Sequence, residues 1–195
     1  GKINIPNDYP SIQAGLSAAS EYDTVQVNVS GSPYTMTSNF QIYPNIILNI
    51  DPGVAIEGGG YTMENFGTLN AVGTEQNRIT FNNLKINPGH NDASGPFYYF
   101  NIQYCNINGG SFYSPTGLAI YGSISLKDSE LNNLGSYIYL WYPVDTCYFE
   151  RNIFNNIGKF SIGSAGMVYI KNNAFYNSGI IESWRGYESN TKVQY

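Results

Sequence analysis

Five stretches of the sequence align with one another, and they start at Ile79, Phe100, Ile124, Cys147 and Val168. Each has apolar residues at two alternate positions, then a small or polar residue, another apolar residue and a glycine. The second apolar residues are Phe81, Ile102, Leu126, Phe149 and Ile170, at successive spacings of 21, 24, 23 and 21. A repeat of this length, with strand-like alternation and no helix between copies, predicts a solenoid with one coil per repeat.

Composition limits the classes of partner. The 195 residues suit one domain, and only 12% of them are charged. A net charge of −5 with nine Lys and Arg argues against nucleic acid as a partner, because binding to phosphates needs clustered cations. No apolar run approaches the roughly 20 residues of a membrane span. Two cysteines and one histidine exclude the common zinc frameworks, and we expect both cysteines to be reduced and packed.

Residues 1–34 differ from the repeats that follow. Ile3 and Ile5 predict a short strand, and Ser11 begins a helix with an apolar face. Val25, Val27 and Val29 alternate as the next strand. The end of a solenoid exposes an open apolar layer, so we expect this helix to cap it and the coils to occupy 35–195.

This N-terminal segment resembles that of right-handed parallel β-helix proteins of the pectate-lyase-like superfamily. The matching residues are Ile5, Pro6, Asp8, Tyr9, Ile12, Gln13, Ala14, Asp23, Thr24, Val25, Val27, Gly31 and Tyr34. The resemblance implies an all-β, single-stranded right-handed parallel β-helix of about seven coils, with three short strands per coil. The superfamily includes lyases, esterases, hydrolases, phage tailspikes and non-catalytic surface proteins, so the resemblance implies a fold more than a function.

Within that fold, two earlier coils are anchored at Val27 and Leu48, and an insertion is expected at Gly58–Gly67. The strand with the anchor is the second of its coil, and the turn after it carries a ladder of stacked side chains. We place in this ladder Asp51, Leu84, Cys105, Ser129, Asn152 and Asn173. The first strands are expected near Gly67–Val72, Gly117–Tyr121, Ile138–Tyr142, Phe160–Gly163 and Ile180–Trp184.

One outward column of the second strands is rich in charge. It contains Asn82, Gln103, Lys127, Glu150 and Lys171. The lyases that this fold resembles use a Lys or Arg as base beside calcium-binding acids. We favour the alternative of a neutralising charge ladder, in which Glu150 lies between two lysines, and we interpret Arg151 beside Asp128 in the same way.

The first-strand face is where enzymes of the superfamily build their sites. The residues expected to point outward there are Ala119, Tyr121, Tyr139, Trp141, Ser161 and Gly163. None of these supplies an acid or a base that works near neutral pH, and we therefore predict no catalytic residue.

Aromatic residues are abundant at positions that alternation places on the surface. Tyrosine and tryptophan rings match the C–H faces of sugars, although tyrosine also stabilises strands by stacking on its neighbours. The predicted carbohydrate-binding residues are Tyr121, Tyr139, Trp141, Tyr148, Tyr169 and Trp184.

Three functional hypotheses follow. The first is a non-catalytic extracellular module that binds polysaccharide or mediates cell-surface adhesion. The second is a polysaccharide lyase or related carbohydrate-active enzyme that uses Asp128, Arg151 and Lys127 or Lys171. The third is a structural segment of a larger multidomain surface or phage fibre protein, because no obvious cap follows the last repeat. No cofactor is expected, and calcium is the one ion that Asp92 could help to bind.

Overall fold

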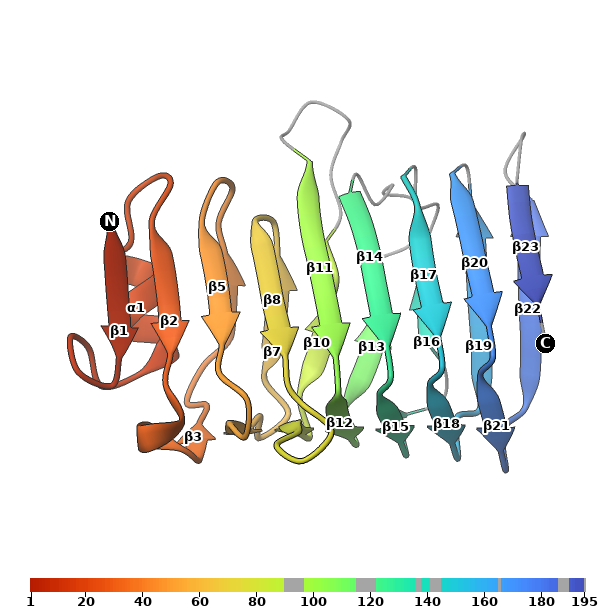
Figure 1. The fold of residues 1–195 in the computed structure, drawn as a ribbon, viewed down its shortest axis with the longest axis horizontal. Helices are drawn as coiled ribbons and strands as arrows, with labels where there is room; N and C mark the ends of the chain where they lie inside the picture. Colours follow the sequence, from red (N-terminus) through yellow and green to blue (C-terminus); the bar gives the residue numbers. More distant parts are fainter. Residues whose placement is uncertain are drawn as a thin grey trace.

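The computed structural model describes residues 1–89, 97–114, 122–135, 138–140, 145–164, 166–185 and 190–194, with backbone alone for 164, 183–185 and 190–194. It is an all-β parallel solenoid of about seven coils, as expected from the repeat. Successive coils lie side by side from the N-terminus to the C-terminus, which are at opposite ends of the molecule (Figure 1).

In the described residues the strands form three parallel sheets. Sheet A contains β1 Lys2–Ile5, β2 Thr24–Val27, β5 Ile47–Ile50, β8 Thr68–Val72, β11 Tyr98–Gln103, β14 Gly122–Lys127, β17 Cys147–Glu150, β20 Met167–Lys171 and β23 Asn190–Gln194. Sheet B contains β3 Tyr34–Thr35, β6 Ala55–Glu57, β9 Ile79–Asn82, β12 Cys105–Asn108, β15 Glu130–Asn132, β18 Ile153–Asn155 and β21 Ala174–Tyr176. Sheet C contains β4 Phe40–Ile42, β7 Thr62–Asn65, β10 Lys85–Asn87, β13 Ser111–Tyr113, β16 Ile138–Leu140, β19 Lys159–Ser164 and β22 Ile180–Arg185.

The chain turns between sheets A and B through left-handed residues such as Asp128 and Arg151, with φ of 50° and 55°. After sheet B it turns again at asparagines, among them Asn133 and Asn156. Asparagine and aspartate tolerate this region of φ better than other residues with a Cβ, which explains why asparagine recurs at these turns.

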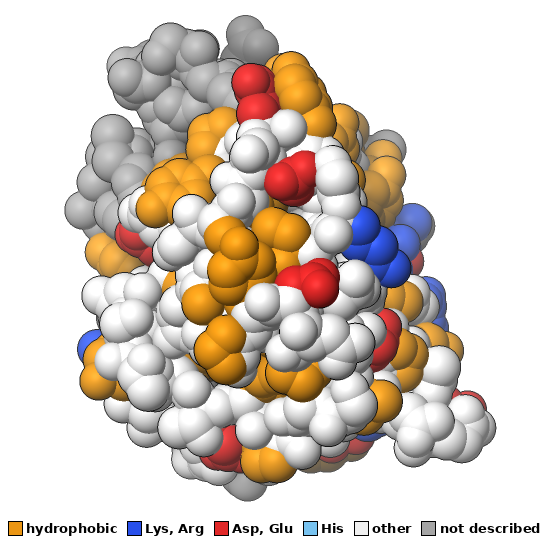
Figure 2. Space-filling model, turned by 90° about the vertical axis from the view of Figure 1, so that its left-hand side faces the viewer, with side chains coloured by type: hydrophobic (Ala, Val, Ile, Leu, Met, Phe, Trp, Pro, Cys, Tyr) orange, Lys and Arg blue, Asp and Glu red, His pale blue; other side chains and the backbone are white. Residues whose placement is uncertain are grey.

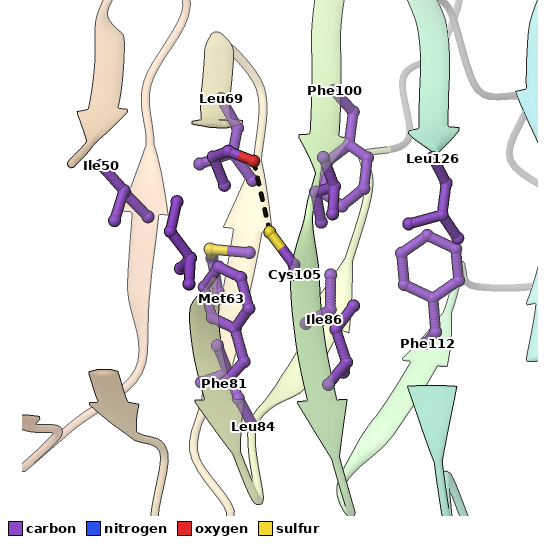
Figure 3. Packing of buried hydrophobic residues seen from close by; sticks show 14 of the residues in the cluster. Ile50, Met63, Leu69, Phe81, Leu84, Ile86, Phe100, Cys105, Phe112 and Leu126 are labelled. Atoms are coloured by element: carbon purple, nitrogen blue, oxygen red, sulfur yellow. Dashed lines mark hydrogen bonds between the residues drawn. The ribbon is translucent and has the colours of Figure 1, made fainter. Parts of the chain in front are cut away.

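Alternate side chains of each strand fill the core. Along β14, Ile124 and Leu126 are buried while Ser123, Ser125 and Lys127 are partly exposed. Apolar residues of successive coils therefore stack into a continuous core (Figure 3). Sheets A and C face each other across it, because Phe100 of β11 packs on Phe112 of β13 with ring centroids 5.5 Å apart.

The N-terminal end is capped as predicted. Helix α1, Ile12–Ala18, begins at Ser11, whose side chain accepts a hydrogen bond from the Ala14 N–H. Its buried residues Ile12 and Leu16 close the apolar layer behind β1, β2 and β4. Figure 2 faces this end and shows hydrophobic side chains scattered over it, with several acidic side chains between them. Val29 was expected to continue β2, but it lies in the short 3₁₀ helix Val29–Gly31 and is half exposed.

The register of the later coils is as predicted. Ile102, Leu126, Phe149 and Ile170 lie opposite one another in sheet A. The placement of Phe81 in this column is wrong: Ala71 lies opposite Ile102, while Phe81 belongs to sheet B beside Ile107. A run of alternating apolar residues fits any of the three strands of a coil, so the pattern alone did not distinguish them.

Several predictions for the neighbouring coils are wrong for the same reason. Ile50, not Leu48, lies between Val27 and Ala71 in sheet A. The stretch 58–67 is no insertion, because it contains the regular strand β7 of sheet C. The strand predicted at Gly67–Val72 is β8 of sheet A rather than a first strand. Asn82 lies in sheet B, and the residue of sheet A opposite Gln103 is Val72.

The ladder after sheet A is present in the later coils. The Cys105 N–H donates to Ser129 Oγ at 3.0 Å, the Ser129 N–H to Asn152 Oδ1 at 3.1 Å, and the Asn152 N–H to Asn173 Oδ1 at 2.9 Å. The prediction that Asp51 and Leu84 belong to this ladder is wrong. Asp51 directly follows Ile50, whereas Cys105 lies three residues after Ile102 in the same column, and Leu84 follows strand β9 of sheet B.

Both cysteines are buried free thiols, as predicted. Cys105 Sγ donates to the Ala71 carbonyl oxygen (Figure 3). No helix in the described part of the chain is long and apolar enough to cross a membrane.

Candidate functional site

The outward face of sheet A carries one long column of polar and aromatic side chains. Paired residues of successive strands place in it Asn4, Gln26, Asn49, Asn70, Asn101, Ser125, Tyr148 and Tyr169. Side chains in such a column are about 4.8 Å apart. The column changes from amides to a small serine and then to two large rings, so its height above the sheet is uneven.

A groove of about 510 Å³ lies where the side chains are small. Its floor is formed by polar residues of β8, β11 and β14, and Tyr99 and Tyr148 stand at its sides. Its full lining is Thr68, Asn70, Tyr99, Phe100, Asn101, Ser123, Ser125, Lys127 and Tyr148. Tyr99 is 54% exposed, and its neighbours on the adjacent strands, Thr68 and Ser123, are small.

The wall at Tyr148 is a stack of two tyrosines. The rings of Tyr148 and Tyr169 have centroids 5.2 Å apart and an interplanar angle of 7°. The Lys127 ammonium lies 4.7 Å from the centre of the Tyr148 ring, and the Lys171 ammonium lies 4.8 Å from that of Tyr169. Stacking and cation–π contacts fix the orientation of both rings, so the wall is rigid.

The floor of the groove offers hydrogen-bonding groups without an internal partner. Within the described residues, no hydrogen bond involves the side-chain amide of Asn101 or the hydroxyl of Ser125. Their neighbours are already bonded: Asn70 Nδ2 donates to Asn49 Oδ1 at 3.0 Å, and Ser123 Oγ donates to the Thr146 carbonyl at 3.3 Å. The groove therefore combines open donors and acceptors with the exposed ring of Tyr99 and with the ring of Tyr148, which Lys127 and Tyr169 contact.

Two ion pairs lie beside the groove. Lys127 Nζ lies 3.3 Å from Glu150 Oε2 in the column Gln103, Lys127, Glu150 and Lys171, whose register is as predicted. Arg151 binds Asp128 through two hydrogen bonds, of 2.6 and 2.9 Å. The Arg151 hydrogen bond lowers the pKa of the Asp128 carboxyl, and Asp128 in turn raises the pKa of Arg151. Of the predicted charge ladder, the Lys127–Glu150 and Asp128–Arg151 pairs are present, whereas Lys171 lies on the Tyr169 ring and forms no ion pair with the residues that the structure describes.

The outward face of sheet C differs from the prediction. Tyr139 and Ser161 do share a column there, but the same column also contains Glu64 and Glu182. Glu64 was not among the residues expected on this face, so the prediction of its outward residues is incomplete. Glu182 accepts hydrogen bonds from Lys159 and from Ser161, and these lower its pKa.

The predicted carbohydrate-binding residues do not share one face. Tyr148 and Tyr169 are on sheet A, whereas Tyr139 is on sheet C. Trp184 ends up at the terminal strand of sheet C, where its backbone pairs with Gly163. Tyr121, Trp141 and Asp92 lie outside the described residues.

Sequence reasoning missed Tyr99, Asn101 and Ser125 as site residues. The alternation of Tyr98, Phe100 and Ile102 as buried residues would have placed Tyr99 and Asn101 outside. A groove, however, depends on which small side chains of adjacent strands become neighbours, and this follows from register rather than from any one repeat.

No group of three or more His, Cys, Asp or Glu within the described residues could hold a metal ion. Searches against protein-family models, curated proteins and solved structures found no significant match to this chain.

Proposed function

We propose that this protein is a non-catalytic, extracellular polysaccharide-binding module that takes a glycan chain into the groove on sheet A. One observation carries the proposal: a groove with a free amide and a free hydroxyl on its floor lies between Tyr99 and the Tyr148–Tyr169 stack. Sugars present apolar C–H faces and hydroxyl groups together, and such a surface matches both.

The arrangement of the groove also favours a chain over a single sugar. Tyr99 of β11 and Tyr148 of β17 are two strands apart, which is about 10 Å along the solenoid axis. A polymer that lies across the strands can contact both rings and the floor between them. A polysaccharide ligand would place the protein at a cell surface or outside the cell, where it would also serve adhesion.

Lyase activity is the alternative, and the contacts of two of its candidate residues, Arg151 and Lys127, argue against it. A lyase needs a base that is free to take a proton at neutral pH. Arg151 is held in its charged form by Asp128, and Lys127 is paired with Glu150. We also propose that the protein belongs to the pectate-lyase-like superfamily. The resemblance of residues 1–34 and the parallel solenoid fold support this, and the fold by itself does not assign an activity.

Binding to insoluble cellulose, chitin, xylan and pectin tests the proposal. We expect wild type to sediment with at least one polymer and Tyr148→Ala to bind about tenfold more weakly, since an aromatic contact contributes about 1.5 kcal/mol. Asn101→Ala should also weaken binding without disturbing an internal hydrogen bond. Tyr176→Ala, which removes an exposed tyrosine of sheet B, is the matched control.

The same samples are monitored for ultraviolet absorbance of unsaturated products. Binding without an absorbance rise supports a non-catalytic module. A rise would identify a lyase instead, and the absence of both signals would favour the hypothesis of a structural segment.

A further inference from the structure

A second depression lies on the opposite side of the solenoid, on the outward face of sheet C. It has a volume of about 200 Å³ and is lined by Thr62, Glu64, Lys85, Ile86, Asn87, Ser111 and Tyr113. These residues come from β7, β10 and β13, which are adjacent strands. Because core side chains of sheets A and C meet at Phe100 and Phe112, the outward faces of the two sheets point away from each other.

The second depression repeats the arrangement of the groove on sheet A. In both, small and polar side chains of successive strands lead to a stacked pair of tyrosines on the C-terminal side. On sheet C this pair is Tyr113 and Tyr139, with ring centroids 5.6 Å apart and an interplanar angle of 25°. The two stacks occupy adjacent strands of their sheets, β13 and β16 in sheet C and β17 and β20 in sheet A.

The polar groups of the second depression are oriented by their neighbours. Glu64 Oε2 accepts from Gln41 Nε2 at 2.6 Å, and Glu64 Oε1 accepts from Asn87 Nδ2 at 3.4 Å. Lys85 is exposed, and its ammonium forms no ion pair with any residue that the structure describes. A fixed carboxylate and a free ammonium beside an aromatic ring can bond to sugar hydroxyls as acceptor and donor.

We infer that the depression at Lys85 and Tyr113 is a second glycan-binding site, and that one molecule therefore cross-links two chains of the same polysaccharide. The inference depends on the proposed function, because it assigns the partner of the second site by its likeness to the first. Two sites on opposite faces of a rigid solenoid cannot engage one straight chain together, so simultaneous occupancy joins separate chains.

A sandwich assay tests this. Protein is bound to the insoluble polysaccharide that wild type sediments with, the excess is washed away, and a fluorescent soluble oligosaccharide of the same polymer is added. We expect wild type to retain the labelled oligosaccharide on the solid. Lys85→Ala and Tyr113→Ala should still bind the solid through sheet A, but should retain at least tenfold less label.

Lys85→Ala keeps the assay informative if Tyr113→Ala fails to fold, because Lys85 is exposed and its ammonium is unpaired among the described residues. Tyr176→Ala is again the control and should retain label like wild type. Wild type that binds the solid in a Tyr148-dependent manner but retains no label would overturn the second site and leave the first intact. Full retention by both Lys85→Ala and Tyr113→Ala would also overturn it. If wild type binds no polymer, both proposals fail together.

Discussion

Asn152 and Asn173, on successive coils, are joined by two hydrogen bonds to a single oxygen. Asn173 Oδ1 accepts from the Asn152 backbone N–H at 2.9 Å and from Asn152 Nδ2 at 3.1 Å. Asn152 also bonds to the preceding coil, since its Oδ1 accepts from the Ser129 N–H and its Nδ2 donates to the Leu126 carbonyl at 2.8 Å. Each side chain therefore satisfies backbone groups that a turn would leave unpaired.

Asn152→Ala should destabilise the protein. The side chain is 1% exposed, and its loss leaves the Ser129 N–H and the Leu126 carbonyl without these partners in a buried turn. We expect the free energy of unfolding to fall by about 1–3 kcal/mol for each group left unsatisfied, measured by urea denaturation. Asn101→Ala is the control, with little expected change. An equal, small effect of both substitutions would show that the ladder adds nothing to stability.

The buried thiols should make the protein sensitive to alkali. Burial raises the pKa of both Cys105 and Cys147 to about 12, against about 8.5 for an unfolded thiol. The folded state therefore holds protons that the unfolded state releases, so the thiols' contribution to stability is constant below about pH 8.5 and decreases as the pH rises from there toward 12. The difference in unfolding free energy between wild type and Cys147→Ala should therefore become smaller as the pH is raised above about 8.5.

Thiol labelling provides an independent measurement of the same burial. At pH 8 neither cysteine should react with an aromatic disulfide reagent in the native protein, and both should react in denaturant. Rapid labelling of the native protein would contradict the expected closed core.

The ion pair of Asp128 and Arg151 should stabilise the protein in a pH-dependent way. Because Arg151 lowers the pKa of Asp128 in the folded state, its contribution is present above the unfolded carboxyl pKa near 3.9 and is lost as the pH falls through the lower folded value. Asp128→Asn retains a residue that tolerates the left-handed backbone, and should cost about 1 kcal/mol at pH 7. Urea denaturation at pH 7 and at pH 2.5 measures this difference, which should be smaller at the lower pH. Glu75→Gln, an exposed acid, is the control and should show little change at either pH.

The fold was predictable because core residues that stack on one another in successive coils recur in the sequence once per coil. Ile102, Leu126, Phe149 and Ile170 could be aligned since each follows another after one full turn of the chain. Phe81 could not be placed in the same way. Its strand, like that of Ile102, alternates apolar and polar residues, and only the backbone pairing with Ile107 shows which sheet it joins.

The candidate groove was predictable only in part. Tyr148 and Tyr169 share a column that the repeat spacing already indicated, and their rings do stack. The open space beside them arises because Ser125 precedes Tyr148 in that column. A depression is formed by three or more neighbouring strands, and it cannot be predicted if the register of one of them is wrong.

Ser125→Tyr uses the register to distinguish a binding groove from an ordinary surface. The new side chain would lie opposite Tyr148, on the side where the Lys127 ammonium contacts the Tyr148 ring, and would fill the floor of the groove. Cross-strand aromatic pairs are favourable, so we expect a melting temperature equal to or above that of wild type. Polysaccharide binding in the sedimentation assay should nevertheless fall at least tenfold, because the ring displaces the ligand. Ser38→Ala, which removes the hydroxyl of an exposed serine outside both grooves, is the control and should leave binding to the solid unchanged. If Ser125→Tyr is stable and binds as well as wild type, the ligand does not enter this groove.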